Sequence, residues 1–154
     1  MSGDLEAALR NVFSPMPISD GDLDEPSNGW MNYEDAPEMR RRIVGRTWHD
    51  LDAKFVDEFH EALIFAGPKT FALMLPAYLD FLLKLNGFSH ALYVVAGQLT
   101  RQHDPVNRSI FDARIAAFTD EQRNLLRDIV SHLATRPAME RAMTSAQTTF
   151  QEFA

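Results

Sequence analysis

One stretch of the chain, residues 69–85, constrains the fold more than any other. Its sequence reads KTFALMLPAYLDFLLKL and is apolar almost all round. A helix of this kind is either buried at the centre of a protein or spans a membrane. The run 71–83 contains Pro76 and Asp80 and falls short of the roughly 20 residues that span a bilayer. The stretch therefore predicts a buried central helix, which Pro76 is expected to kink or divide.

Amphipathic patterns predict that further helices pack around the central one. The clearest start is Thr119 with Gln122 three residues later, which has the form of a capping box. Residues 91–95 (ALYVV) are the nearest strand candidate, but helix is preferred there because an isolated strand has nothing to pair with. The other expected helices run from Asp35 to Gly45, after Asp52 as far as Gly67, over 89–101, over 107–117 and after Pro137.

The N-terminal arm, residues 1–38, holds all of the excess negative charge. It contains nine acidic residues against Arg10 alone, a net charge of −8, whereas the rest of the chain sums to +1. The arm opens with an amphipathic helical pattern over residues 4–13, which Ser14-Pro15 ends. Residues 15–32 show little periodicity and predict a long surface loop. Any electrostatic function is therefore expected in the arm.

These patterns predict an all-α fold. We expect a compact bundle of about six to seven helices, preceded by an acidic and partly irregular N-terminal arm. A chain of 154 residues suits a single hydrophobic core, so we predict one domain over residues 1–154, with the arm at 1–38 and the helical core at 39–154.

Carboxylates and aromatic side chains occur together in the second half of the arm. Carboxylates attract a charged partner over a long range, and aromatic side chains dominate the energy of interfaces. This combination suits a basic protein partner. The predicted partner-binding residues are Asp20, Asp22, Asp24, Glu25, Trp30, Tyr33, Glu34 and Asp35. The alternative is a solvated loop whose aromatic residues fold back onto the domain.

Several kinds of chemistry lack the residues that they need. The absence of Cys excludes disulfides, thiolate zinc sites and Cys nucleophiles. No G-x-S-x-G elbow or glycine-rich phosphate loop occurs, so we predict no catalytic residue and no cofactor. Acids alternate from Asp20 to Asp24 as in a calcium loop, but Glu25 stands where that loop needs Gly and Met31 where it needs Glu. We predict no metal site.

The surroundings of the protein are predicted from its charge and its N-terminal residues. The basic cluster 40–46 directly follows seven acids, so direct nucleic-acid binding is not expected. The sequence MSGDLEAALR lacks the apolar run of a secretory signal. We therefore expect a cytoplasmic protein with no membrane partner.

Two alternative functions from other classes remain open. One is a metal-dependent hydrolase that uses His49, Asp50, His60 or His132, although Asp57-x-x-His60 and Asp128-x-x-x-His132 each occur once and lack the matching second set that a metal-binding bundle needs. The other is a helical structural or regulatory scaffold, which can form a homodimer.

Three segments in sequence order resemble a family of uncharacterised bacterial proteins. They are GRTWHDL at 45–51, GPKTFALMLPAYLDFLL at 67–83 and FTDEQRNLLRDIVSHL at 118–133, and the resemblance covers about residues 36–134. The matching positions are Trp48, Leu51, Phe71, Leu75, Pro76, Ala77, Tyr78, Leu79 and Phe118. The resemblance implies a small helical fold and a bacterial cytosolic origin, and it carries no catalytic residue.

In general character the chain also resembles the immunity proteins that neutralise bacterial toxins. In those proteins carboxylates cover a basic active site, often one that processes nucleic acids or nucleotides. The leading hypothesis is therefore a non-enzymatic, protein-binding inhibitor of the immunity or antitoxin kind. Its partner is expected to be a basic, toxin-like protein.

Overall fold

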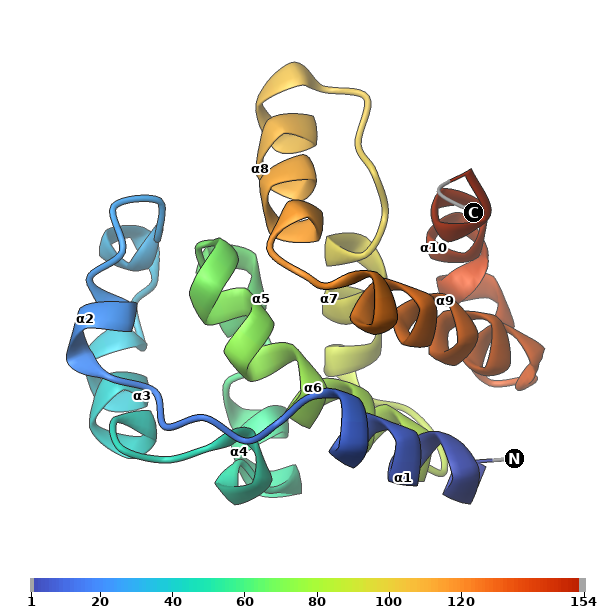
Figure 1. Cartoon of the computed structure of the whole chain (residues 1–154), viewed down its shortest axis with the longest axis horizontal. Helices are drawn as coiled ribbons and strands as arrows, with labels where there is room; N and C mark the ends of the chain where they lie inside the picture. The colour runs from blue at the N-terminus through green and yellow to red at the C-terminus, as the bar shows by residue number, and fades with distance from the viewer. Residues whose placement is uncertain (1, 153–154) are drawn as a thin grey trace.

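The chain is helical wherever it has regular structure (Figure 1). It is described here by a computed structural model that covers residues 2–152. Within that range the ten α-helices are α1 (Ser2–Val12), α2 (Asp20–Leu23), α3 (Ala36–Ile43), α4 (Ala53–Glu58), α5 (Ala62–Phe65), α6 (Pro68–Lys84), α7 (His90–Gln98), α8 (Pro105–Ala116), α9 (Asp120–Thr135) and α10 (Glu140–Glu152). Two 3-10 helices are η1 (Trp30–Asn32) and η2 (Trp48–Asp50). Residues 2–152 contain no strand, so the all-α prediction is confirmed, including a helix over residues 91–95.

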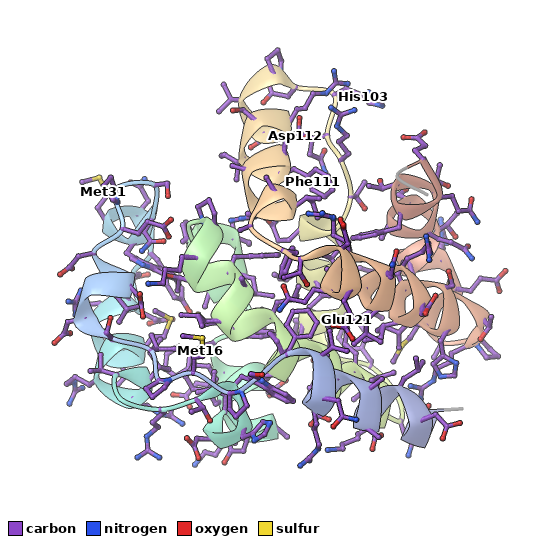
Figure 2. The ribbon with its side chains drawn as sticks, viewed as in Figure 1. Met16, Met31, His103, Phe111, Asp112 and Glu121 are labelled. Atoms are coloured by element: carbon purple, nitrogen blue, oxygen red, sulfur yellow. The ribbon has the colours of Figure 1, made fainter. Side chains whose placement is uncertain are left out.

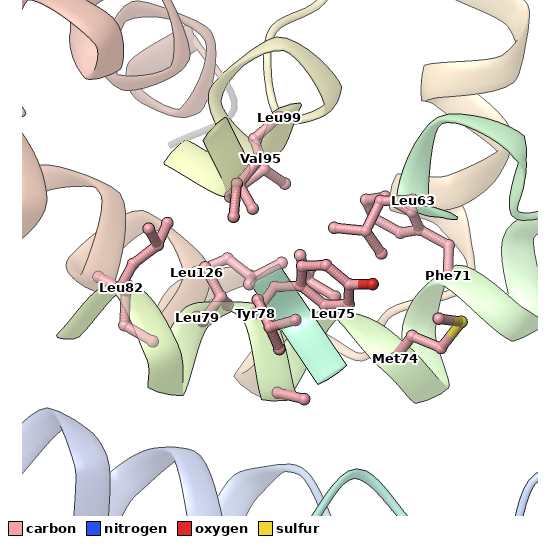
Figure 3. Packing of buried hydrophobic residues seen from close by; sticks show 14 of the residues in the cluster. Leu63, Phe71, Met74, Leu75, Tyr78, Leu79, Leu82, Val95, Leu99 and Leu126 are labelled. Atoms are coloured by element: carbon pink, nitrogen blue, oxygen red, sulfur yellow. The ribbon is translucent and has the colours of Figure 1, made fainter. Parts of the chain in front are cut away.

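The central helix is α6, which contains the apolar stretch. It packs against α1, α2, α4, α5, α7, α8 and α9. Figure 3 shows its side chains Phe71, Leu75 and Tyr78 among those of the neighbouring helices. Tyr78 is fully buried, and its Oη donates a hydrogen bond of 2.6 Å to the carbonyl oxygen of Phe59. In the described part of the chain, no helix combines the length and apolar character that crossing a membrane requires.

Pro76 does not divide α6, which runs without interruption from Pro68 to Lys84. Proline lacks a backbone N–H, so the helix loses the hydrogen bond that residue 76 would otherwise donate to the carbonyl of Ala72. Pro76 is buried, and the packing around it opposes a break in the helix. Division, one of the two outcomes expected from the sequence, is therefore excluded.

The expected count of about six to seven helices is too low, since residues 2–152 form ten α-helices. Two segments in particular fold differently from their sequence patterns. Ser19 and Asp22 form a reciprocal capping box, which starts α2 inside the predicted loop. The segment after Asp52 forms two short helices, α4 and α5. Phe59 leaves the helical conformation between them, with φ −109° and ψ 41°, and its carbonyl oxygen accepts the hydrogen bond from Tyr78.

The second half of the arm, with α2 and η1, forms one end of the molecule, whereas α1 at its start packs on α6 and α9. In Figure 1, α2 and α3 lie at the opposite end of the long axis from α9 and α10. Ile18, Leu23 and Tyr33 are buried in the same apolar cluster as the side chains of α6. A parallel bridge joins Ile18 to Val44. Arm and central helix therefore share one apolar cluster. The single domain over residues 1–154 stays a prediction, and residues 1 and 153–154 lie outside the described range.

Candidate functional site

Two of the predicted partner-binding acids hold α2 against α3. Arg40, on α3, lies 3.1 Å from a carboxylate oxygen of Asp20 and 2.9 Å from one of Asp24. A hydrogen bond from Arg40 holds the pKa of Asp24 below its ordinary value. The carboxyl groups of Asp20 and Asp24 are still 69% and 65% exposed. Each carboxylate is therefore paired within the chain and still contributes negative charge at the surface.

Two further acids attach the arm to the start of α6. The Asp22 carboxylate lies 2.5 Å from Lys69 Nζ and also accepts a hydrogen bond of 3.0 Å from the Ser19 N–H. Burial opposes its ionisation, but the hydrogen bonds from Lys69 and Ser19 outweigh this and keep the pKa of Asp22 below its ordinary value. Glu25 accepts a hydrogen bond of 3.3 Å from the Lys69 N–H in the first turn of α6, where the helix dipole favours a negative charge.

Asn28 completes this attachment. Its Nδ2 donates to the carbonyl oxygens of Asp22 and Leu23, at 3.2 Å and 2.8 Å, and its Oδ1 accepts from the Gly67 N–H. A Cβ added at Gly67 would lie 2.5 Å from Asn28 Oδ1 and 2.6 Å from a Glu25 carboxylate oxygen. An added Cβ at Gly67 would therefore displace the side chains of Asn28 and Glu25 at the point where the arm meets α6.

The aromatic residues of the arm form a stack with α5. Tyr33 is buried and lies parallel to Phe65, with 4.9 Å between ring centroids and 11° between planes. The ring centroid of Trp30 lies 6.2 Å from that of Tyr33, with the two planes tilted by 39°. Its Nε1 is buried, and the described chain offers no acceptor for it. An unpaired indole N–H of this kind costs free energy that a carbonyl group from another molecule would recover.

A cleft of about 540 Å³ opens beside this stack, between α2, η1 and α3. Its walls include Leu23, Trp30, Tyr33 and Met39. Met31 lies at its edge and is 92% exposed, and Figure 2 shows it at the outer tip of the arm. A cleft with apolar walls and a fully exposed Met is typical of a surface that receives an apolar side chain of a partner.

Several acidic residues lie around the cleft, and Arg40, which is paired with Asp20 and Asp24, is the basic residue that lines it. Burial, and then the carboxylates of Asp35, Glu61 and Glu58, raise the pKa of Tyr33 to about 12. Glu34 lies at the edge of the cleft and, like Asp35, is exposed. Neither carboxylate makes a hydrogen bond or ion pair within residues 2–152, and Asp35, expected to cap α3, makes no capping bond. These two acids are the ones free to meet a cation.

The residues proposed for a hydrolase do not assemble into one site. Asp50 forms a capping box with Thr47, and His132 shares a hydrogen bond of 2.9 Å with Ser2. His60 stacks on His90 with 5.5 Å between ring centroids. His49 lines a cavity between α1 and α6. Among the described residues, no group of three or more His, Asp or Glu is arranged to hold a metal ion.

Comparisons with known proteins give no relative: the chain matches no protein-family model, no curated protein and no solved structure. The resemblance to the uncharacterised bacterial family therefore stays a prediction. The assignment of the candidate site is therefore based on its geometry alone.

Proposed function

We propose that the protein is a non-enzymatic binding domain that receives an apolar side chain of a basic protein partner in the cleft of the arm. Its most concrete form is an inhibitor of the immunity or antitoxin kind. The cleft supports this proposal because it combines the exposed Met31, the unpaired indole N–H of Trp30 and the unpaired carboxylates of Glu34 and Asp35. Apolar anchor residues beside unpaired carboxylates favour a partner that carries positive charge around an apolar side chain.

The acids of the arm have two different roles in this proposal. Asp22 and Glu25 hold the arm on α6, and Asp20 and Asp24 hold α2 on α3. Reversing all of them would unfold the arm as well as remove its charge. Glu34 and Asp35 can be reversed without breaking a side-chain hydrogen bond or ion pair within residues 2–152. Variants at these two positions therefore test binding without disturbing the fold.

The experiment captures partners from the source cells and then measures the affinity of the recovered partner for variants. We expect Glu34→Lys with Asp35→Lys to weaken binding about tenfold or more at low salt, with a smaller effect at high salt. Glu121→Lys with Asp128→Lys is the matched control, since it makes the same charge change on α9. It should leave the affinity nearly unchanged.

A second variant pair tests the apolar part of the cleft. Met31→Asp should weaken binding about tenfold or more, because it places a charge where the partner's apolar side chain inserts. Val106→Asp, at a residue 68% exposed on α8, is the matched control. Equal affinity of all four variants and the unmodified protein would disprove the assignment of the cleft, provided that circular dichroism shows each variant folded.

A further inference from the structure

A second cleft, of about 450 Å³, lies between α1, η2 and α6. Its floor is apolar and includes Leu51, Phe81 and Leu85. Trp48 also lines it, with its indole N–H donating a 2.9 Å hydrogen bond to the carbonyl oxygen of Phe13. Small-molecule sites are typically clefts of this size that have apolar walls and a few polar groups.

Asp80 gives this cleft an unsatisfied acceptor. One of its carboxylate oxygens lies 2.8 Å from Lys84 Nζ, and the other is buried with no hydrogen-bond donor in the described chain. Leaving a buried carboxylate oxygen unpaired is costly, so a donor from outside the chain would be bound favourably. Lys84 is about half exposed and has a flexible side chain, so it can move aside for such a donor.

The other polar residues that line the cleft are Arg10, Asn86, His49 and Asp52, and the Asp52 carboxylate already accepts the capping bond of α4. Arg10 reaches it from α1 and makes no hydrogen bond or ion pair within residues 2–152. Asn86 lines the same cleft and likewise has no partner in that range. A guanidinium group binds a carboxylate through two parallel hydrogen bonds. The cleft thus offers a carboxylate, a guanidinium and an apolar surface together.

We propose that this cleft binds a free α-amino acid with an apolar side chain. The ammonium group donates to Asp80, the carboxylate accepts from Arg10, and the side chain packs on Phe81 and Leu85. A zwitterion fits better than a simple anion or cation, because each of its charges has an opposite partner in the cleft. This site is separate from the arm cleft, so the two proposals stand or fall independently.

The protein's two tryptophans allow the site to be tested directly. Trp30 lines the arm cleft and Trp48 lines this one, so Trp30→Phe leaves Trp48 as the only reporter. The probes are L-leucine, L-methionine and L-phenylalanine. We expect saturable changes in Trp48 emission in this variant and a higher melting temperature of the unmodified protein with at least one of them.

Derivatives and variants identify the contacts. N-acetyl-L-leucine lacks the ammonium charge and L-leucinamide lacks the carboxylate, so both should bind about tenfold or more weakly than L-leucine. Asp80→Asn should weaken L-leucine binding by about the same factor, and Arg10→Gln should make L-leucine and L-leucinamide bind equally. Glu121→Gln on α9 removes one negative charge elsewhere and should change nothing.

Two results would overturn the proposal. The first is that none of the three amino acids changes either Trp48 emission or the melting temperature. The second is that L-leucine binds Asp80→Asn and Arg10→Gln with the affinity of the unmodified protein, which would place its binding site elsewhere.

Discussion

Single arginine side chains close the C-terminal ends of three helices. Arg123 donates to the carbonyl oxygens of Ile115 and Phe118 after α8, and Arg136 donates to those of Leu82 and Leu83 at the end of α6. Arg114 does the same for α5. The last four carbonyl groups of a helix have no partner within it, and the helix dipole makes that end negative. Arg114 and Arg136 therefore join helices that are distant in sequence, whereas Arg123 joins the start of α9 to the end of α8.

Arg114 is the most deeply buried of the three, with 3% of its surface exposed. It donates to the carbonyl oxygens of Leu63, Ile64 and Ala66 and lies 4.5 Å above the ring of Phe71. Burial lowers the pKa of Arg114 to about 10, so the side chain still carries its charge at neutral pH. We predict that Arg114→Met lowers the free energy of unfolding by about 3 kcal/mol, measured by urea titration, because it strands buried carbonyl groups.

The control for this prediction is Arg141→Met, at an exposed position of α10, which should change stability by no more than about 0.5 kcal/mol. Arg114→Lys should recover only part of the loss, since an ammonium group cannot reach all of these carbonyls at once. Equal stability of Arg114→Met and Arg141→Met would show that the buried guanidinium contributes nothing.

Tyr33 reports the negative charge around the arm cleft. Its pKa is raised from 10.0 to about 12, first by burial and then by Asp35, Glu61 and Glu58. The folded state holds the phenol proton more tightly than the unfolded state, so this contribution to stability is lost as pH rises from 10.0 through about 12. We predict that Asp35→Asn with Glu61→Gln lowers the pKa of Tyr33 but keeps it above 10.0, because burial remains.

The measurement follows the ultraviolet absorbance of the phenolate in a Tyr93→Phe background, which removes an exposed tyrosine. Tyr78 does not interfere, since burial raises its pKa well above the ordinary value. An unchanged pKa of Tyr33 in the double variant would mean that the acids exert no field on the cleft. That result would weaken the case for a basic partner.

Whole helices could be predicted from the sequence where the signal is local. The capping box of Thr119 and Gln122 starts α9 as expected, because both hydrogen bonds lie within one turn. The same signal stood at Ser19 and Asp22, but the Pro- and Gly-rich surroundings pointed to a loop. The break between α4 and α5 had no local signal, since the carbonyl of Phe59 is taken by Tyr78 from another helix.

The junction between α2 and α6 depends on a glycine. We predict that Gly67→Ala destabilises the protein by about 2 kcal/mol, because the new methyl group pushes Asn28 and Glu25 away from α6. Hydrogen exchange should become faster in α2 and η1 and stay slow in α9. Gly97→Ala is the matched control, since no atom lies within 4 Å of the added Cβ, and it should be neutral or stabilise α7 by up to about 1 kcal/mol. Uniformly faster exchange in Gly67→Ala would contradict a local junction.

The candidate site as a whole could be predicted only in part. Trp30, Tyr33 and Glu34 do lie together at the arm cleft, as their closeness in sequence suggested. The ion pairs of Asp22 with Lys69 and of Asp20 with Arg40 join residues far apart in the chain, so composition alone made these acids look free. The second cleft was missed for the same reason, since Arg10 and Asp80 meet only in the fold.

The molecule as a whole should release the second half of its arm in acid before its body, which includes α1, unfolds. The pKa values of Asp22 and Asp24 lie below their ordinary value of 3.8, so these carboxylates stabilise the docked arm above that pH. This stabilisation is lost as the pH falls below 3.8 and through the lower pKa values of the folded state. The two indole N–H signals in an NMR spectrum can separate the events. We expect the Trp30 signal to move first, while the buried Trp48, hydrogen-bonded to Phe13, keeps its position until the helices melt.

Lys69→Gln provides the decisive variant for this prediction. It removes the cation that favours ionised Asp22, so the Trp30 transition should move to higher pH while the Trp48 transition stays in place. Arg141→Gln removes a positive charge on α10 and should move neither. A single transition in which both indole signals change together would mean that arm and body unfold as one unit. In that case the acids of the arm would stabilise the whole fold, and not only the packing of the second half of the arm against α3 and α6.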